Sequence, residues 1–491
     1  MDFEARDRLR DAIQEAGVVG AGGAGFPAHV KLAADAEALI VNACECEPLI
    51  EVDQHLLATH TDLFLQGLEY AIHLTGATKA AIAIKAKHTR NIAQLEAALA
   101  DRPNIELVRT DDFYPAGDEQ VLVYDVLGRV VPRGGIPLAV GCVVHNVETL
   151  INIARAAEGV PVTTTFVTVA GALPLPATYE LPIGISYREA LALCGAAGDT
   201  ELEGMAALDG GPMMGKLVLD LDAPITKTTK AVILLEADRR VIVEKALSDA
   251  EILRQSRAAC EQCRKCTDLC PRDLLGHEVR PHLVMRAVSY RGAGAGAAET
   301  AESAAAGCAS ASAGEGAGAD GNASAGAGGR YFADLNDLRG ALACSKCGAC
   351  ELYACPNGLS PRRVNVLLEQ QLAQAVREDR GEKAEASAPA PSPMFAYRKI
   401  PTGRLVARLG LSAWNREAPL KSLPYAPTRV TLPLKQHIGA PARAVVAVGD
   451  TVRRGTVIGR VCAGALGANV HASIDGTVTA ASETAVSITS E

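Results

Sequence analysis

The sequence predicts a multidomain protein that combines α/β and α+β units with a helical, cysteine-bearing domain and an all-β domain at the C-terminal end. Three observations support this prediction. Helical and strand patterns alternate through the first 160 residues, eight of the 14 cysteines gather in two short runs, and a stretch of Ala, Gly and Ser separates those runs. A chain of 491 residues is also too long for one core, so it should divide into domains of roughly 100 to 200 residues each.

Residues 1–160 are expected to form an α/β layered domain. The apolar residues Leu9, Ile13 and Ala16 follow the spacing of one helix face, whereas AAIAIKA at 80–86 is a continuous apolar run typical of a buried strand. Alternation of these two patterns is characteristic of a layered α/β fold.

A glycine-rich loop lies near the start of this block. Its sequence is GVVGAGGAGFPAHVK, residues 17–31, with Gly20, Gly22, Gly23 and Gly25 inside six positions. Glycine lets backbone N–H groups approach a phosphate closely, and a helix that follows adds a favourable dipole. A bare glycine cluster does not separate a phosphate cradle from a tight turn without a ligand, so both interpretations stay open.

Residues 163–240 are expected to form a small α+β module. Two strand-like runs, TTTFVTVAG and AVILLEA, flank one helix-like segment, YREALALCG. Short β-rich runs around a single helical pattern favour an α+β unit over a layered α/β domain.

Two cysteine runs, each ending in Cys-Pro, predict iron–sulfur ligands within a helical domain at 250–375. The runs are Cys260, Cys263, Cys266 and Cys270, then Cys344, Cys347, Cys350 and Cys355. In two-cluster ferredoxins, three closely spaced cysteines hold one 4Fe-4S cluster and the Cys-Pro thiolate reaches the other. This logic places Cys260, Cys263 and Cys266 with Cys355 around one cluster. It places Cys344, Cys347 and Cys350 with Cys270 around the other. Zinc is the alternative, but four-cysteine zinc sites normally use two CxxC pairs separated by a longer loop.

The second run departs from the usual spacing. Four residues separate Cys350 from Cys355, where the ferredoxin pattern has three. The spacing therefore leaves the fourth ligand open.

Two segments are expected to be unstructured. Residues 291–329 are almost entirely Ala, Gly and Ser, a composition that buries too little apolar surface to offset its ordering entropy. Cys308 lies in this insert and is not expected to be a ligand. Residues 376–393 are charged and then Pro-rich, as in a linker.

Charge and hydropathy exclude other classes of function. The net charge of −9 and the pI near 5.7 argue against nucleic acid as a partner, because such binding needs a basic surface. The sequence shows neither a secretory signal nor an apolar run of about 18 residues that could form a transmembrane segment. We expect a reducing, cytoplasmic environment in which cysteines serve as ligands.

Four motifs in the first block together resemble known flavin-binding proteins. VNACECEP at 41–48, YPAGDEQ at 114–120 and HNVETL at 145–150 follow the glycine loop in order. Over about 130 residues they are similar to the flavin subunit of respiratory complex I and to the RnfC protein of the Rnf electron-transport complex. The sequence departs from the complex I pattern at Cys44, where that family has an acid, and at Asp118, where it has Glu.

The resemblance implies a role for each matching position. The residues implied to hold FMN are Gly22, Gly23, Gly25, Lys31, Asn42, Asn146 and Thr149. Phe26 would stack on the nicotinamide dinucleotide, NADH. The acids implied to bound the pocket where NADH lies over the flavin are Glu45, Glu47, Asp118 and Glu119. Taken singly, each acid could equally be part of a solvated loop surface.

Resemblance also covers the two remaining blocks. Residues 163–240 resemble the SLBB-like β-grasp module that follows the flavin domain in the related families, either as a corrinoid-binding unit or as a spacer. Residues 395–491 resemble a lipoyl-like barrel-sandwich, with strand pairs joined by Val-Gly-Asp and Asp-Gly turns. Between Val461 and Val478 no lysine is available to carry a cofactor, so a docking or structural role is expected.

The order of these blocks resembles the cobalamin reductase of propanediol-utilisation microcompartments. That resemblance implies an NADH-dependent enzyme in which FMN and two 4Fe-4S clusters deliver electrons to the cobalt of a corrinoid. It further implies a bacterial microcompartment as the location, with adenosyltransferase and shell proteins as partners. His277 and His282, near the first cysteine run, could approach a corrinoid or be ordinary helix or surface histidines.

Two other functions remain open. The chain could be an Rnf-type electron-input subunit of a membrane-associated complex, although the barrel-sandwich precedes the flavin domain in that family and here comes last. It could also be a non-catalytic electron relay. The glycine loop with its matching acidic motifs argues against a relay.

Overall fold

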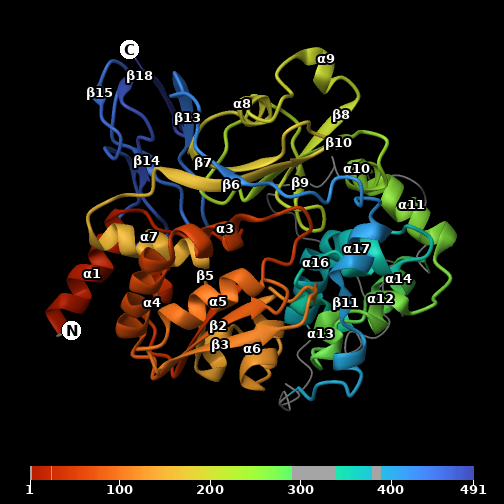
Figure 1. Ribbon diagram of the computed structural model, residues 1–491. Helices are drawn as coiled ribbons and strands as arrows, with labels where there is room; N and C mark the ends of the chain where they lie inside the picture. Colours follow the sequence, from red (N-terminus) through yellow and green to blue (C-terminus); the bar gives the residue numbers. More distant parts are fainter. Residues whose placement is uncertain (1–2, 24, 290–337, 379–388, 491) are drawn as a thin grey trace, which may run out of the picture.

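A four-stranded parallel sheet forms the centre of the first block (Figure 1). The computed structural model describes residues 3–23, 25–289, 338–378 and 389–490. The strands follow the order β3-β2-β1-β5, and every pair is parallel. They are β1 (Ala38–Ala43), β2 (Lys79–Lys85), β3 (Ile105–Thr110) and β5 (Cys142–Asn146). The α/β layering predicted from the alternating patterns is confirmed.

Helices cover both faces of this sheet, because successive strand side chains point to opposite faces. Leu39 and Val41 of β1 share a core with Leu65 and Ile151 on one face, whereas Ile40 packs into a different core on the other. The first face is covered by α3 (Val52–Thr59), α4 (Thr61–Thr75), α5 (Thr89–Ala98) and α7 (Val147–Ala157), and the second by α6 (Glu119–Leu127). The block also contains α1 (Phe3–Glu15), α2 (Ala28–Lys31), β4 (Phe113–Tyr114) and η1 (Pro137–Val140).

Local sequence signals set the ends of several helices. Helix α6 begins after Asp118, whose carboxylate accepts hydrogen bonds from the backbone N–H groups of Gln120 and Val121. Helix α4 ends at Gly76, which adopts a left-handed φ of 67°. The Ser186 and Glu189 side chains form a capping box at the start of α8 (Tyr187–Ala192).

A mixed six-stranded sheet lies across the top of the molecule in the view of Figure 1. Its order is β12-β7-β6-β10-β8-β9, with β6 parallel to β10 and antiparallel to β7. The strands are β6 (Thr164–Gly171), β7 (Ala177–Pro182), β8 (Met205–Asp209), β9 (Lys216–Leu217), β10 (Ala231–Glu236) and β12 (Leu420–Lys421). Helices α8 and α9 (Asp199–Leu202) belong to this block, which is thus α+β. Its SLBB-like β-grasp assignment remains a prediction.

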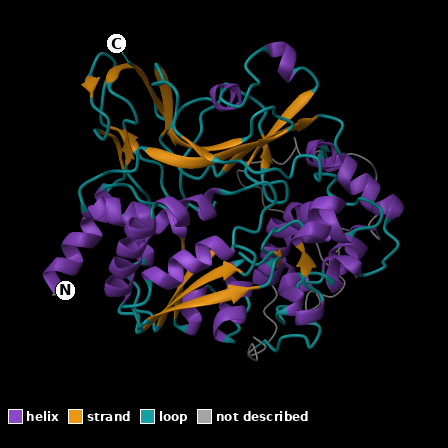
Figure 2. Ribbon diagram, viewed as in Figure 1, coloured by secondary structure: helices purple, strands orange, loops and turns teal. Residues whose placement is uncertain are grey.

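A group of helices of different lengths forms the domain that contains the two cysteine runs (Figure 2). Their apolar faces pack together through Ile252, Val284 and Leu368. The helices are α10 (Arg240–Ala246), α11 (Asp249–Ala259), α12 (Lys265–Asp268), α13 (Pro271–Leu274), α14 (Pro281–Ser289), η4 (Arg339–Ala343), η5 (Ala349–Ala354) and α16 (Pro361–Glu378). The predicted insert 291–329, with Cys308, and residues 379–388 of the predicted linker lie outside the described residues.

Two antiparallel sheets of four and three strands form the C-terminal barrel-sandwich. Val430 and Ile488 of this domain belong to the same core cluster as Leu39 of the parallel sheet, so the barrel is packed onto the rest of the molecule. The strands are β13 (Arg429–Pro433), β14 (Arg443–Ala444), β15 (Thr451–Val452), β16 (Val457–Arg460), β17 (Val470–His471), β18 (Gly476–Ala481) and β19 (Ala485–Thr489).

The stretch before the barrel pairs with two other blocks. It contains η6 (Phe395–Tyr397), β11 (Ile400–Pro401), α17 (Thr402–Arg408) and β12. Strand β11 pairs with β4 of the first block, and β12 extends the edge of the mixed sheet beside β7. The C-terminal block was expected to start at residue 395, but the barrel strands start at Arg429 and residues 395–421 form a strap across the other domains.

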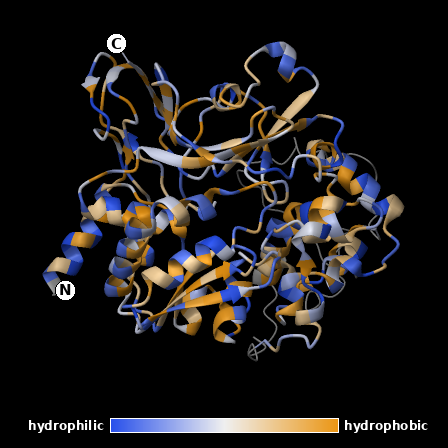
Figure 3. Ribbon diagram, viewed as in Figure 1, coloured by the Kyte–Doolittle hydropathy of each residue, from blue (hydrophilic) through white to orange (hydrophobic). Residues whose placement is uncertain are grey.

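The distribution of polarity follows these layers. The strands of the parallel sheet are largely apolar in Figure 3, whereas the helices that cover it alternate apolar and polar residues along their length. This pattern is expected of a buried parallel sheet between amphipathic helices.

Candidate functional site

The flavin motifs gather at the carboxyl edge of the parallel sheet. Asn42 near the end of β1 and Asn146 at the end of β5 are direct register partners. The chain leaves β1 toward β2 and β3 on one side and returns to β5 on the other, so the strand order reverses between β1 and β5. In open α/β sheets, ligands bind outside the carboxyl ends of the strands at such a reversal. The predicted flavin residues therefore lie where this topology favours a ligand.

The glycine loop folds back over this edge. Gly20 donates its N–H to the Phe26 carbonyl at 2.8 Å, which closes the loop, and Ala21 N–H donates to Thr149 Oγ1 at 3.0 Å. Gly23 has a left-handed φ of 104°, and a Cβ added there would meet no protein atom within 4 Å. A Cβ at Gly22 would be 3.7 Å from Asn146. The loop thus presents bare backbone next to open space, which fits a phosphate-bearing ligand.

Lys31 and Glu119, both predicted to belong to the site, form an ion pair with each other. Lys31 Nζ lies 2.9 Å from Glu119 Oε1 and donates to the Val144 carbonyl at 2.6 Å. Asn42 donates its Nδ2 to the Gly117 carbonyl at 2.9 Å, and this contact holds the YPAGDEQ motif against β1. The structure thus brings together residues from all four motifs.

Glu47 and Asp118, two further predicted acids, are also engaged by protein groups. Glu47 accepts hydrogen bonds from the backbone N–H groups of Met213 and Met214, at 2.9 and 2.8 Å. Asp118 caps α6 and also binds Arg272 at 2.9 Å. Because their carboxylates stabilise loops of this chain, a direct role for either acid with NADH remains a prediction.

Glu45 belongs to a buried network of charged residues that the sequence motifs did not indicate. Its Oε1 accepts from the Asp53 N–H at 3.0 Å, while its Oε2 is buried without a hydrogen-bond partner among the described residues. Asn146 Nδ2 donates to Asp53 at 2.7 Å, and Lys230 forms an ion pair with Glu148 in the same network. Burial, followed by the charge of Asp53, raises the pKa of Glu45 to about 8. Burial likewise raises the pKa of Asp53 to about 6.

The eight clustered cysteines line two separate cavities. The first thiol pocket is formed by Cys260, Cys263, Cys266 and Cys355. The second thiol pocket is formed by Cys270, Cys344, Cys347 and Cys350. Each pocket combines three thiols of one run with the Cys-Pro thiol of the other, which is the grouping that the ferredoxin pattern predicts. Within the described ranges, no set of three or more His, Cys, Asp or Glu side chains is arranged to hold a single metal ion.

Both cysteine loops follow the same backbone path. Gln262 and Arg264, two and four residues after Cys260, have left-handed φ angles of 54° and 64°. Lys346 and Gly348, two and four residues after Cys344, have φ angles of 58° and 79°. Non-glycine residues rarely adopt this conformation, so its repetition indicates a shared requirement to curl each loop around its pocket.

Backbone N–H groups point at the sulfurs of these pockets. Lys346 N–H lies 3.4 Å from Cys344 Sγ, and Leu359 N–H lies 3.3 Å from Cys355 Sγ. Hydrogen bonds to sulfur are one of the means by which proteins set the reduction potential of iron–sulfur clusters. Burial raises the pKa of the Cys266 and Cys347 thiols to about 12, so cluster binding would displace a proton from each.

The unusual spacing in the second run has a structural explanation. Residues Ala349–Ala354 form a π-helical turn, whose hydrogen bonds span one residue more than those of an α-helix. The extra residue between Cys350 and Cys355 is absorbed in this turn, so Cys355 still reaches the first thiol pocket.

The two histidines singled out near the first run differ in position. His277 is buried and its Nε2 lies 2.9 Å from the Val131 carbonyl. His282 lines the first thiol pocket, with Nδ1 at 2.7 Å from Thr267 Oγ1. His277 is therefore occupied within the protein core, whereas His282 borders the pocket.

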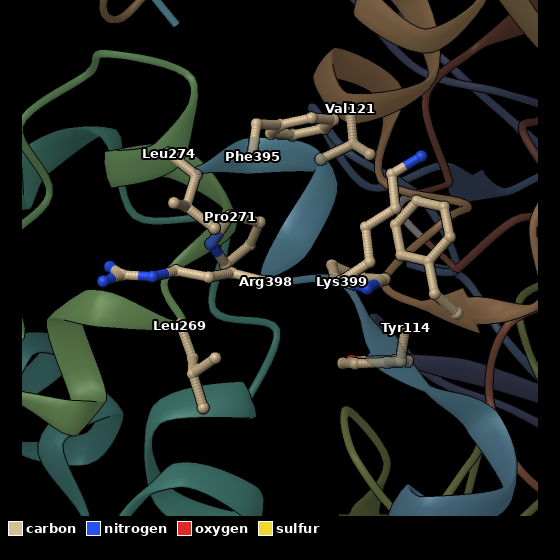
Figure 4. Close-up of a pocket in the computed structure, with 10 residues that line it drawn as sticks. Tyr114, Val121, Leu269, Pro271, Leu274, Phe395, Arg398 and Lys399 are labelled. Carbon is tan, nitrogen blue, oxygen red and sulfur yellow. The ribbon is translucent and has the colours of Figure 1, made fainter. Parts of the chain in front are cut away.

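A small apolar cavity separates the flavin block from the helices that carry the cysteines (Figure 4). Tyr114 and Val121 line it from the flavin block, Pro271 from the Cys-Pro turn, and Phe395 and Lys399 from the strap. The strap residues thus close the junction between the two blocks. Along the part of the chain that the structure describes, no helix has the length and apolar character needed to cross a membrane.

Comparisons with known families agree with this layout. Residues 13–155 match the model of the Nuo51 FMN-binding domain, residues 259–313 that of the 4Fe-4S dicluster domain, and residues 413–491 that of the RnfC barrel sandwich hybrid domain. The predicted flavin-type, cluster-type and barrel-sandwich domains are confirmed at this level.

Comparisons with whole proteins extend over nearly the full chain. The chain is 43% identical to the cobalamin reductase PduS of Salmonella typhimurium, over 98% of this chain and 96% of that protein. It is 41% identical to the PduS protein of Citrobacter freundii, with the same coverage. A third relative is a component of the Na+-translocating ferredoxin:NAD+ oxidoreductase complex of Acetobacterium woodii, which is 32% identical over 55% of this chain and 59% of that component.

Proposed function

Because the chain belongs to the PduS family of cobalamin reductases, we propose that it transfers electrons from NADH, through FMN and two 4Fe-4S clusters, to the cobalt of a corrinoid. The observation that carries this proposal is the presence, in one chain, of two four-thiol pockets and of a glycine loop at the strand-order reversal of a parallel sheet. FMN accepts an electron pair as hydride and releases electrons singly, and the clusters carry single electrons.

The donor sets fit the cofactors. Each thiol pocket supplies four cysteines, the ligand number of a 4Fe-4S cluster, from two loops with matching backbone conformations. At the flavin site, bare backbone of the glycine loop faces the edge that bears Asn42 and Asn146. Gly22, Gly23 and Gly25 would hold the FMN phosphate side, and Asn42 would meet the flavin ring.

The protein residues contribute positioning and charge. Thr149 and the Gly20–Phe26 contact hold the glycine loop open toward the sheet edge. Burial raises the pKa of Glu45 well above its ordinary value, so this carboxyl can hold or release a proton beside the flavin site. Phe26 is the predicted stacking partner of the dinucleotide.

Partners and location follow from the family. We propose that the enzyme works within a bacterial microcompartment, where an adenosyltransferase would take up the reduced corrinoid and shell proteins would surround both. The mixed sheet of residues 164–236 would serve as a spacer or as the corrinoid contact.

Anaerobic purification and an acceptor panel test the function. We expect about one FMN and, from two 4Fe-4S clusters, about eight irons per chain. NADH should bleach both chromophores, and hydroxocobalamin should reoxidise them as reduced cobalt accumulates. Rapid reoxidation by ferredoxin with none by cobalamin would instead favour the Rnf-type alternative. If the protein holds both cofactors but NADH does not reduce them, the electron-relay function would be favoured.

A further inference from the structure

A buried ion pair joins the flavin block to the second thiol pocket. Arg272 NH2 lies 2.9 Å from Asp118 Oδ2, and the two side chains are 11% and 7% exposed. Asp118 follows Gly117, whose carbonyl accepts from Asn42 of the predicted flavin site. The contacts therefore run from the flavin site through Asp118 to Arg272.

Arg272 is also part of the wall of the second thiol pocket. It follows Cys270 by two residues and lines the cavity together with the four thiols. Its Nε is buried and has no hydrogen-bond partner among the described residues. The guanidinium thus places a permanent, poorly solvated positive charge beside these cysteines.

The two pockets differ in this respect. Arg362, the other arginine that lines the second pocket, is likewise paired with a buried acid, Glu351, at 2.6 Å. In the first pocket, the lining arginine is Arg264, which is exposed to solvent. Solvent screens an exposed charge far more than a buried one, so Arg264 influences the first pocket less than the buried Arg272 influences the second.

A second buried contact fixes the same junction. The Tyr114 hydroxyl donates to the Cys347 carbonyl at 2.5 Å, and Tyr114 is 2% exposed. Tyr114 and Asp118 belong to one short stretch of the flavin block, so this stretch touches both loops of the second pocket.

From these contacts we propose that Arg272, held by Asp118, is a positioning residue that secures the second thiol pocket against the flavin block and raises the reduction potential of the cluster bound there. The inference rests on the proposed cofactor content, but not on NADH or cobalamin as substrates. A nearby positive charge stabilises the cluster state that carries one more electron, and the negative charge of Asp118 partly offsets this effect.

Redox titration of charge variants tests the proposal. The cluster signals would be followed by electron paramagnetic resonance, with dithionite as the electron donor and mediators present. Arg272→Gln should reduce the equilibrium constant for one-electron reduction of one cluster at least tenfold, a downward shift of about 59 mV for a one-electron couple. Asp118→Asn should raise the potential of the same cluster, because asparagine keeps the helix cap but removes the charge. The double variant should return to within about threefold of the unmodified protein.

Two control variants separate charge from structure. Arg272→Lys keeps the charge and should keep the potential, although the fork geometry is lost. Arg188→Gln removes an arginine of a surface ion pair with Asp222 and should change neither cluster.

The outcomes are distinct. Opposite shifts in the two single variants, confined to one cluster, would support the proposal. Equal shifts of both clusters, or an unchanged potential in Asp118→Asn, would overturn it, and the latter result decides the matter even if Arg272→Gln loses iron. A protein with about eight irons that fails to reduce cobalamin would contradict the proposed function and leave this test intact.

Discussion

At the scale of single residues, Gly23 has the conformation that a ligand-binding loop requires. Its φ of 104° is strained for any residue with a side chain, and the space where a Cβ would lie contains no protein atom. The motif comparison placed this glycine at the phosphate side of FMN, and the open space around it agrees with that prediction.

Substitution of Gly23 by leucine should remove the flavin and spare the clusters. The side chain would occupy the space beside the loop, so the purified variant should lose most of its FMN yet keep about eight irons. Gly76→Leu is a matched control, since Gly76 also has a positive φ of 67° and open space around it. Each substitution should cost about 1–2 kcal/mol of stability, but the control should retain its flavin. Joint loss of flavin and iron in Gly23→Leu would contradict separate sites.

Glu45 makes stability depend on pH. Burial holds the pKa of this carboxyl in the folded protein well above the ordinary value of 4.5, near which the unfolded chain releases the proton. Between these values the folded state binds more protons, so the free energy of unfolding falls as the pH rises.

Glu45→Gln should remove part of this pH dependence. Glutamine keeps an acceptor for the Asp53 N–H and carries no charge, so the variant should gain stability over the unmodified protein at pH 9 but not at pH 4. Thermal unfolding across this pH range measures the difference. Parallel pH profiles of the two proteins would be inconsistent with a raised pKa at Glu45.

At the scale of elements, the two cysteine loops exchange their last ligands. The Cys-Pro turn of each run enters the pocket built by the other, and the π turn Ala349–Ala354 lets the longer second run do so. Each pocket therefore depends on both halves of the helical domain.

Exchange of ligands predicts which cluster each cysteine variant affects. Cys355→Ala should remove iron from the first thiol pocket although Cys355 belongs to the second run, and the iron content should fall from about eight to about four. Cys270→Ala should do the same for the second pocket. Resonance spectra of the two variants should show complementary clusters. If Cys355→Ala abolished the cluster affected by Arg272→Gln, the pairing would be wrong.

At the scale of the whole molecule, buried polar contacts join three blocks around Lys227. This side chain is 3% exposed and its Nζ donates to the carbonyls of Gly17 and Asn469, at 2.8 and 2.7 Å. Gly17 is the first residue of the glycine loop, and Asn469 lies in the barrel. The barrel-sandwich thus supports the loop of the flavin site. This structural role does not require a lysine for cofactor attachment.

Lys227→Met should loosen this junction. Two buried carbonyl oxygens would lose their donor, at a cost of about 1–3 kcal/mol each, offset in part by the removal of a buried charge. We expect a lower midpoint of thermal unfolding and weaker flavin retention, measured anaerobically by calorimetry and absorbance. Lys435→Met, an exposed position near this junction, is the control and should change neither. Unchanged behaviour of Lys227→Met would mean that the barrel does not support the loop.

The sequence alone predicted the residues that would bind the cofactors of this protein. Cysteine spacing and the Cys-Pro ends of the two runs predicted which thiols share a pocket, because ligand geometry requires short, fixed separations along the chain. The glycine loop and its companion motifs likewise predicted which residues meet at the sheet edge. These signals are local, so they can be recognised without coordinates.

The tertiary structure alone decided how these parts are joined. Arg272 and Asp118 are 154 positions apart, and the strap residues that pair with β4 and β7 are more distant still. No local spacing encodes such pairs, because a buried ion pair or a strand edge is specified by the packing of whole domains. The π turn belongs here too, since the sequence showed an extra residue but the three-dimensional path showed that Cys355 still reaches its pocket.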